Sequence, residues 1–109
     1  MKPKEVAAAV LQAIDRYRPP LTGQSLLGRP WSLERIEQEI GKLRQSLLLP
    51  SVRPMSNQPH EVWLVAQRDG YVVFFDEKGA EYGLGTLEED GRIEDINVRG
   101  DLVGCFMSR

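Results

Sequence analysis

The apolar positions in the first fifty residues recur every three or four residues, which is the spacing of a helix with one buried face. The repeating positions of the first such segment are Val6, Val10, Ile14 and Tyr17. Pro19 and Pro20 follow this segment, and a proline disfavours helical geometry at the residue before it. The pattern therefore predicts a helix over about residues 3–17.

A second amphipathic segment follows a loop that runs from about Pro19 to Trp31. Its apolar stripe consists of Leu33, Ile36, Ile40, Leu43 and Leu47. Ser32 stands directly before the stripe, where a hydroxyl caps the first backbone N–H groups of a helix. Gly41 lies inside the segment at a cost of about 1 kcal/mol relative to alanine, so we expect another backbone to pack closely there. The prediction is a helix over about 33–47.

From Glu61 onward the period of the apolar pattern changes to two, which indicates strands. The predicted strands are 61–67, 71–76, 80–87, 92–98 and 102–107. The short breaks between them each hold a glycine beside charged residues, which is typical of hairpin turns. Residues 50–60 contain three prolines and are predicted to be an extended connector with at most one short edge strand. The fold class is thus α+β: a single domain over 1–109, with two N-terminal helices packed on a C-terminal antiparallel meander of about five strands over 61–107.

Both faces of the first two predicted strands are apolar, although an antiparallel sheet covered on one side normally shows polar residues on the other. Two helices cover one face only. We therefore expect the second face to be enclosed by curvature of the sheet, as a roll or barrel-like form, or by a second copy of the chain. The candidate self-association face consists of Trp63, Val65, Val72 and Phe74.

Composition and charge narrow the function classes. Apolar residues make up 41% and charged residues 28% of the 109 residues, which is typical of a globular domain. The longest apolar stretch, Val72 to Phe75, is too short to span a membrane, so we expect no membrane contact and a cytoplasmic location. Residues 1–50 carry a net charge of +3 and residues 51–109 a net charge of −5. The acidic half argues against a nucleic-acid partner, because it would repel a phosphate backbone.

Candidate chemistry is sparse. The single cysteine, Cys105, excludes an internal disulfide, and the single histidine, His60, argues against the common metal sites. His60 with Glu61, or Cys105 with either, would need a third group to form a catalytic arrangement. We therefore predict no catalytic, metal or cofactor site, and interpret Cys105 as a small apolar residue of the last strand.

Two charge features remain as candidate partner-binding sites. Glu88, Glu89 and Asp90 form an acidic turn, and Arg29 and Arg53 each precede a proline. The sequence favours a small non-enzymatic protein–protein interaction domain, such as an adaptor, an inhibitor or an immunity-type binder, acting as a homodimer or with a protein partner. The alternative is a small-molecule-binding or enzymatic domain with a pocket between helices and sheet. The polar contacts of that pocket would be Tyr71, Tyr82, Arg53 or His60.

Overall fold

A computed structural model describes residues 1–18 and 31–109, which form three helices and five strands. The helices are α1 (Pro3–Asp15), α2 (Leu33–Ser46) and α3 (Leu102–Met107). The strands are β1 (Leu47–Pro54), β2 (Glu61–Arg68), β3 (Tyr71–Asp76), β4 (Glu81–Leu87) and β5 (Ile93–Gly100). All neighbouring strands pair antiparallel in the order β1-β2-β3-β4-β5. The predicted α+β class and the antiparallel meander are confirmed.

The two N-terminal helices form for the predicted reasons. α1 buries three residues of its apolar stripe, Val6, Val10 and Ile14. α2 begins after Ser32, whose hydroxyl accepts a hydrogen bond from the backbone N–H of Arg35 at 3.1 Å. It ends at Ser46, one residue before the predicted end, because Leu47 is already extended and pairs with Ala66 of β2. In the described part of the chain, no helix has the length and apolar character needed to cross a membrane.

The expectation of a close backbone contact at Gly41 is wrong. A Cβ atom built on Gly41 would have no heavy atom within 4 Å, apart from its own chain neighbours and helix backbone. Gly41 is also classed as exposed. The glycine therefore weakens α2 without a packing reason in the described residues.

Residues 50–60 contain an edge strand, as the prediction allowed, but β1 is longer than expected because it begins at Leu47. This strand of 8 residues pairs with β2 along most of its length, with an irregularity between Leu47 and Ser51. Proline is accepted here because β1 is an edge strand, and N–H groups on its outer edge have no ladder partner to lose.

The predicted last strand, 102–107, is also wrong, because these residues form helix α3. The carboxylate of Asp101 caps the helix by accepting a hydrogen bond from the backbone N–H of Gly104 at 2.9 Å. The break before residue 102 is therefore a strand-to-helix junction rather than a hairpin turn. Nearly every residue of α3 is buried, and a short run that is apolar almost throughout fits a strand and a short buried helix equally well.

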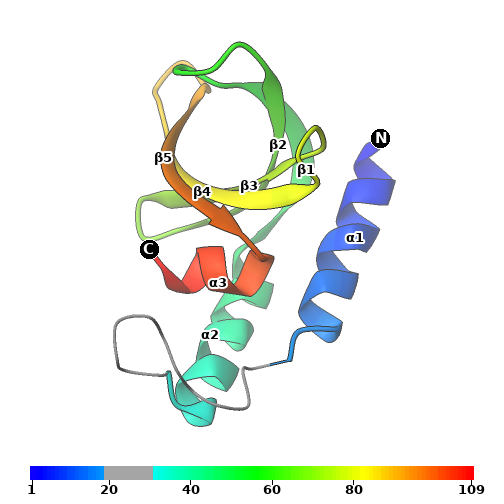
Figure 1. Cartoon of the computed structure of the whole chain (residues 1–109), viewed down its shortest axis with the longest axis vertical. Helices are drawn as coiled ribbons and strands as arrows, with labels where there is room; N and C mark the ends of the chain where they lie inside the picture. Colours follow the sequence, from blue (N-terminus) through cyan, green and yellow to red (C-terminus); the bar gives the residue numbers. More distant parts are fainter. Residues whose placement is uncertain (19–30) are drawn as a thin grey trace.

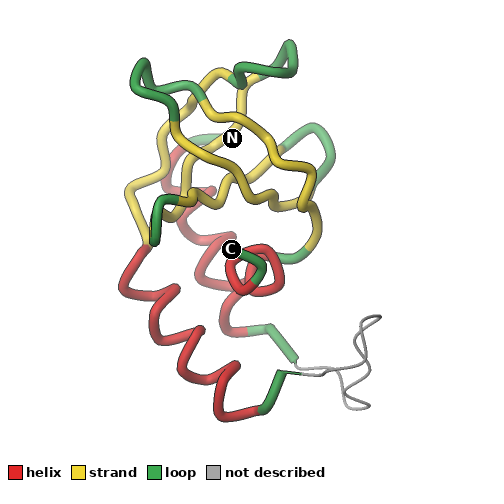
Figure 2. The backbone as a smooth tube through the Cα atoms, turned by 90° about the vertical axis from the view of Figure 1, so that its left-hand side faces the viewer, coloured by secondary structure: helices red, strands yellow, loops and turns green. Residues whose placement is uncertain are grey.

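The sheet is covered on both faces, as its apolar pattern predicts. One set of side chains, here called the outer core, lies between the sheet and the helices, which sit on its outer side (Figures 1 and 2). The other set, the inner core, lies within the curve of the sheet. Its members are Met55, Val62, Leu64, Val72, Phe74 and Ile93.

Curvature encloses the inner core without closing a barrel. β1 and β5 form the two ends of the sheet and share no ladder. The segment after β1 contacts β5 through a bridge between Met55 and Ile93 and a hydrogen bond of 2.9 Å from Ser56 N–H to the Ile93 carbonyl. Gly83 of β4 makes room for the ring of Phe74, which a Cβ atom at that position would overlap.

Candidate functional site

β2 and β3 separate at one end of the sheet. Their ladder stops at the pair Trp63 and Phe75, although β2 begins at Glu61 and β3 continues to Asp76. On its other side β2 stays paired with β1 as far as Pro54, which lies opposite Glu61. A gap therefore opens between the start of β2 and the turn that follows β3.

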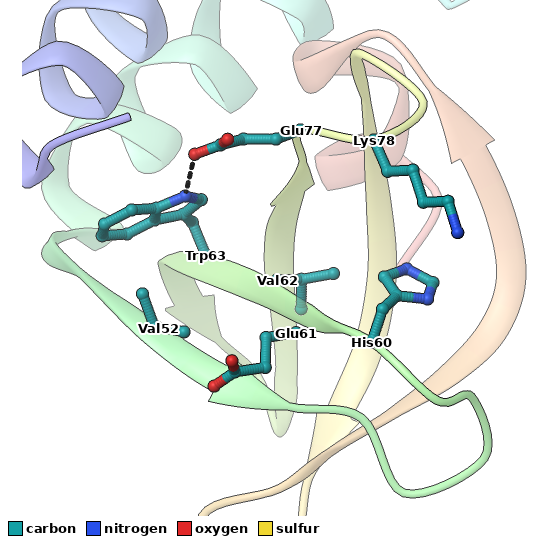
Figure 3. Close-up of a pocket in the computed structure, with 7 residues that line it drawn as sticks. All are labelled: Val52, His60, Glu61, Val62, Trp63, Glu77 and Lys78. Atoms are coloured by element: carbon teal, nitrogen blue, oxygen red, sulfur yellow. Dashed lines mark hydrogen bonds between the residues drawn. The ribbon is translucent and has the colours of Figure 1, made fainter.

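A cleft of about 420 Å³ occupies this end of the sheet (Figure 3). Its lining residues are Val52, His60, Glu61, Val62, Trp63, Glu77 and Lys78. Val52 and Trp63 lie on one side of the view in Figure 3, and His60 and Lys78 on the other. Val52 is 47% exposed and Trp63 is 8% exposed, so the apolar side of the cleft combines an open aliphatic side chain with a nearly buried indole.

The indole of Trp63 is held in place by a carboxylate. Its Nε1–H donates a hydrogen bond of 2.7 Å to Oε1 of Glu77, the first residue after β3. This hydrogen bond, with the Met1 ammonium at 3.1 Å, holds the pKa of Glu77 below its usual value. The contact fixes Trp63 in one orientation and leaves Glu77 ionised at neutral pH.

Two further charges line the cleft. Glu61 and Lys78 are both classed as exposed, and within residues 1–18 and 31–109 neither side chain forms an ion pair at 4.0 Å or less. The Lys78 side chain extends toward His60 in Figure 3, away from Trp63. The cleft therefore offers an available carboxylate and an available ammonium group at different places along its wall.

Asp76 connects two residues on the same side of the cleft, His60 and Lys78. Its Oδ2 lies 3.1 Å from Nε2 of His60 and accepts a hydrogen bond of 2.8 Å from Nη1 of Arg99, while Oδ1 accepts the backbone N–H of Lys78 at 3.1 Å. Burial by itself would raise the pKa of Asp76, which is 5% exposed, but the hydrogen bonds from Arg99 and His60 outweigh burial and lower that pKa. The carboxylate thus stays ionised and ties the start of β2 to the turn after β3.

Arg99 joins this carboxylate to a second one. Its Nη2 donates a hydrogen bond of 2.7 Å to Oδ2 of Asp95, which is 4% exposed and also accepts the Gln58 side-chain amide at 2.7 Å. The guanidinium carbon lies 5.0 Å from the centre of the Phe74 ring. The Arg99 network, defined here as Arg99, Asp76, Asp95, His60 and Gln58, therefore packs against the inner core with its charges paired.

The groups considered for catalysis are placed differently from the expectation. His60 points at Asp76 rather than forming a contact with Glu61. Cys105 lies in α3 rather than in a strand, and burial raises the pKa of its thiol to about 12. A thiol with that pKa is protonated at neutral pH and is therefore a poor nucleophile. Its burial agrees with the interpretation of Cys105 as a small apolar residue.

The four residues of the candidate self-association face do not share one face. Trp63 and Val65 belong to the outer core, whereas Val72 and Phe74 belong to the inner core, and all four are buried within one copy of the chain. The register explains the division, because Trp63 pairs with Phe75 and not with Phe74. Residues one position apart in a strand point to opposite faces. These four side chains therefore form no common exposed surface for a second copy, and Trp63, at 8% exposed, is accessible at the cleft.

The candidate partner-binding charges are partly brought together. Arg29 lies outside the described residues. Arg53 of β1 rests against the turn after β4, since a Cβ atom at Gly91 would lie 2.7 Å from its Nη1. In the same turn, Asp90 pairs with Arg92 at 2.7 Å.

The two remaining carboxylates of that turn, Glu88 and Glu89, are half-buried and exposed respectively. Glu88 lies 3.9 Å from the same Arg92. The turn is therefore less negative than the sequence alone indicates.

The polar residues of the alternative pocket are scattered. Tyr82 is part of the outer core and Tyr71 packs against it, while Arg53 lies at the turn after β4. His60 is the one member of this set that lines the cleft in Figure 3. The set does not define a common pocket between helices and sheet.

Sequence reasoning missed the Arg99 network and the cleft. A signal for part of the network was present, because the period of two that places Val72 and Phe74 on one face continues to Asp76. A carboxylate in phase with buried residues requires a partner. The partner itself, Arg99, depends on the cross-strand register, which places it opposite Gly83 and so beside Phe74.

Comparisons of the chain with protein-family models, with curated proteins and with solved structures gave no significant match.

Proposed function

We propose that the protein is a small non-enzymatic protein–protein interaction domain whose partner binds at β1 and at the cleft beside it. The observation that carries the proposal is the exposure of three apolar side chains on this edge strand. Leu48, Leu49 and Val52 are 39%, 91% and 47% exposed, and Val52 also lines the cleft. We call these three residues the β1 strip. Single exposed aliphatic side chains are ordinary, but several on one short segment beside a cleft favour a binding surface.

The energy available from the strip is large enough for a specific contact. Full burial of one large aliphatic side chain contributes about 1.5–3 kcal/mol. Leu49 is nearly fully exposed, so its burial by a partner would contribute most of this free energy to binding. Val52 lines the adjoining cleft, so a partner that covers it also reaches the cleft.

The partner contacts side chains rather than adding a strand to the outer edge of β1. The hydrogen bond of 3.2 Å from Met55 N–H to the His60 carbonyl shows which residues bond to β2, because bonding alternates along an antiparallel strand. Arg53 then faces β2, while Val52 and Pro54 turn their backbone groups outward. Pro54 has no N–H to donate, so the outer edge is poorly suited to strand addition.

Under this proposal the partner is either another protein or a second copy of the chain. The strip would then lie in a symmetric contact between two molecules. A reducing compartment such as the cytoplasm suits this chain, whose single cysteine is a buried free thiol.

Small-molecule binding in the same cleft is the second candidate function, because about 420 Å³ lies within the range of ligand pockets. A metabolite that raises the melting temperature of the protein would support this candidate. The effect should disappear when Lys78 or Glu61 is replaced by alanine, since both line the cleft.

The test of the main proposal is a double replacement in the strip, Leu49→Asp with Val52→Asp. The wild-type chain and the variant are used to capture binding proteins from a lysate of the source cells, and light scattering measures self-association. Leu33→Asp is the matched control, because Leu33 is 66% exposed and a negative charge in the first turn of a helix is favourable. A protein partner or dimer that survives the control but is lost with the double variant supports the proposal. Equal binding by all three chains would contradict it.

A further inference from the structure

We infer that the partner enters the cleft as an extended peptide segment that carries a lysine or arginine side chain. The inference rests on the proposed function and specifies the kind of side chain that binds in the cleft. Three features favour such a ligand: the backbone of Glu61, the apolar side of the cleft, and the charges along its wall.

The backbone of Glu61 is directed into the gap. The His60 carbonyl accepts a hydrogen bond from the N–H of Met55, the residue directly after β1. The alternation of hydrogen bonds therefore makes Val62 face β1 and Glu61 face the β3 side. The ladder to β3 stops at Trp63, so Glu61 has no opposite residue there. No hydrogen bond to another described residue is formed by the backbone of Glu61 on that side. An extended peptide carries complementary N–H and carbonyl groups with the same spacing as those of a neighbouring strand.

The apolar side of the cleft receives the stem of a long side chain. Val52 and Trp63 are opposite each other across β1 and β2, so their side chains lie on the same face. Glu77 fixes the Trp63 indole, which lowers the entropy lost when a ligand packs against it. Lysine and arginine carry an apolar stem below a charged head, which matches an aliphatic and aromatic wall with carboxylates beside it.

The charges on this side of the cleft favour a cation. Glu61 and Glu77 lie on the side of Val52 and Trp63 in Figure 3, whereas the ammonium group of Lys78 extends to the other side. Glu77 is already paired with the Met1 ammonium at 3.1 Å, so Glu61 is the carboxylate that remains for a ligand. The whole chain carries a net charge of −2, so the wider field attracts a basic segment weakly. A charge-assisted hydrogen bond to Glu61, which has no ion pair among the described residues, adds to this attraction.

The experiment uses the full chain labelled with nitrogen-15 and two probe peptides, acetyl-Thr-Val-Lys-Val-Thr-amide and the same peptide with glutamate in place of lysine. We expect the lysine peptide to shift the backbone amide signal of Glu61 and the indole signal of Trp63 in a saturable way. The affinity of the glutamate peptide should be at least about tenfold lower, because one hydrogen bond to a charged group contributes about that factor. Glu61→Gln should remove most of this preference. Glu37→Gln, an exposed position on α2 outside the cleft, should retain it.

Equal affinity for the two peptides, or shifts confined to residues outside the cleft, would overturn the inference. If neither peptide binds while a captured protein is still lost with the β1 strip variant, the inference is overturned and the proposed function stands. If the lysine peptide binds in the cleft but no protein or second copy depends on the strip, the inference is supported and the proposed function fails. The two ideas are therefore tested separately.

Discussion

Replacement of Arg99 by methionine tests whether one guanidinium stabilises the two buried carboxylates. Methionine keeps an unbranched apolar stem over Phe74 but removes the positive charge and the hydrogen bonds that Arg99 donates to Asp76 and Asp95. Leaving a buried charge without its partner costs about 3–5 kcal/mol. We expect the lower end, about 3 kcal/mol, because the Arg99 side chain is itself 20% exposed. That loss is a large share of the roughly 5–15 kcal/mol by which a domain of this kind is stable.

The cost should depend on pH in a defined direction. In the wild type the pKa of Asp76 is lowered by folding, so its contribution to stability is present above the unfolded value of about 3.9 and is lost as the pH falls through the folded value. In Arg99→Met, burial acts on Asp76 without the opposing guanidinium and raises its pKa. Proton binding then stabilises the folded variant. The difference between the two proteins should therefore shrink as the pH falls from 7 to about 3.5.

Urea unfolding followed by tryptophan fluorescence at both pH values measures this difference. Arg92→Met is the matched control, because Arg92 pairs with Asp90 at 2.7 Å but is 49% exposed, and exposed ion pairs contribute about 0–1 kcal/mol. A loss below about 1 kcal/mol for Arg99→Met at pH 7 would refute the reasoning, since it would fall within the range of exposed pairs. A loss of the same size at both pH values would refute the linkage to the carboxylates.

Three further predictions follow from the packing. Gly41→Ala should raise stability in urea melts by about 0.5–1 kcal/mol, because the added methyl group meets nothing and glycine weakens a helix. Gly83→Ala should lower it by about 1–3 kcal/mol, because its Cβ atom would overlap the Phe74 ring, whereas an unchanged melt would show that the ring moves aside at no cost. The thiol of Cys105, which is 2% exposed, should resist a thiol-specific reagent at pH 8 in the native state and react in urea, so rapid native labelling would contradict its burial.

The parts of the fold that depend on local pattern could be predicted from the sequence. The cap at Ser32 and the apolar stripes of both N-terminal helices are features of a few neighbouring residues. The strand 71–76 matches β3 in both bounds, because a glycine and a charged turn limit it on each side. The coverage of both sheet faces also followed, since alternation is visible within each strand.

The predictions for residues 50–60 and 102–107 differ from the structure because the local pattern there is compatible with two kinds of secondary structure. Pro50 and Pro54 predict a connector with at most one short edge strand, whereas the chain forms an edge strand of 8 residues, because proline is compatible with the outer edge of such a strand. Residues 102–107 are apolar at most positions, so their period cannot distinguish a buried strand from a buried helix. Asp101, which caps α3, is a local signal for the helix, but a glycine beside charged residues equally predicts a turn at this break.

The candidate site was beyond prediction because it depends on where pairing stops. Nothing in residues 61–63 shows that β2 continues pairing with β1 after it has left β3. Likewise, the division of Trp63 and Phe74 between two cores follows from a cross-strand register that a single residue of slip would reverse. Such properties belong to pairs of distant segments rather than to either segment alone.

Asp76 links the stability of the curved sheet to the shape of the cleft. The same carboxylate that accepts from Arg99 at the inner core also contacts His60 and the backbone of Lys78, which lie on one side of the cleft. This side of the cleft is therefore fixed by a buried carboxylate that is itself kept ionised. A ligand that enters the cleft meets walls already fixed in place, so little of its binding free energy is spent on ordering the protein.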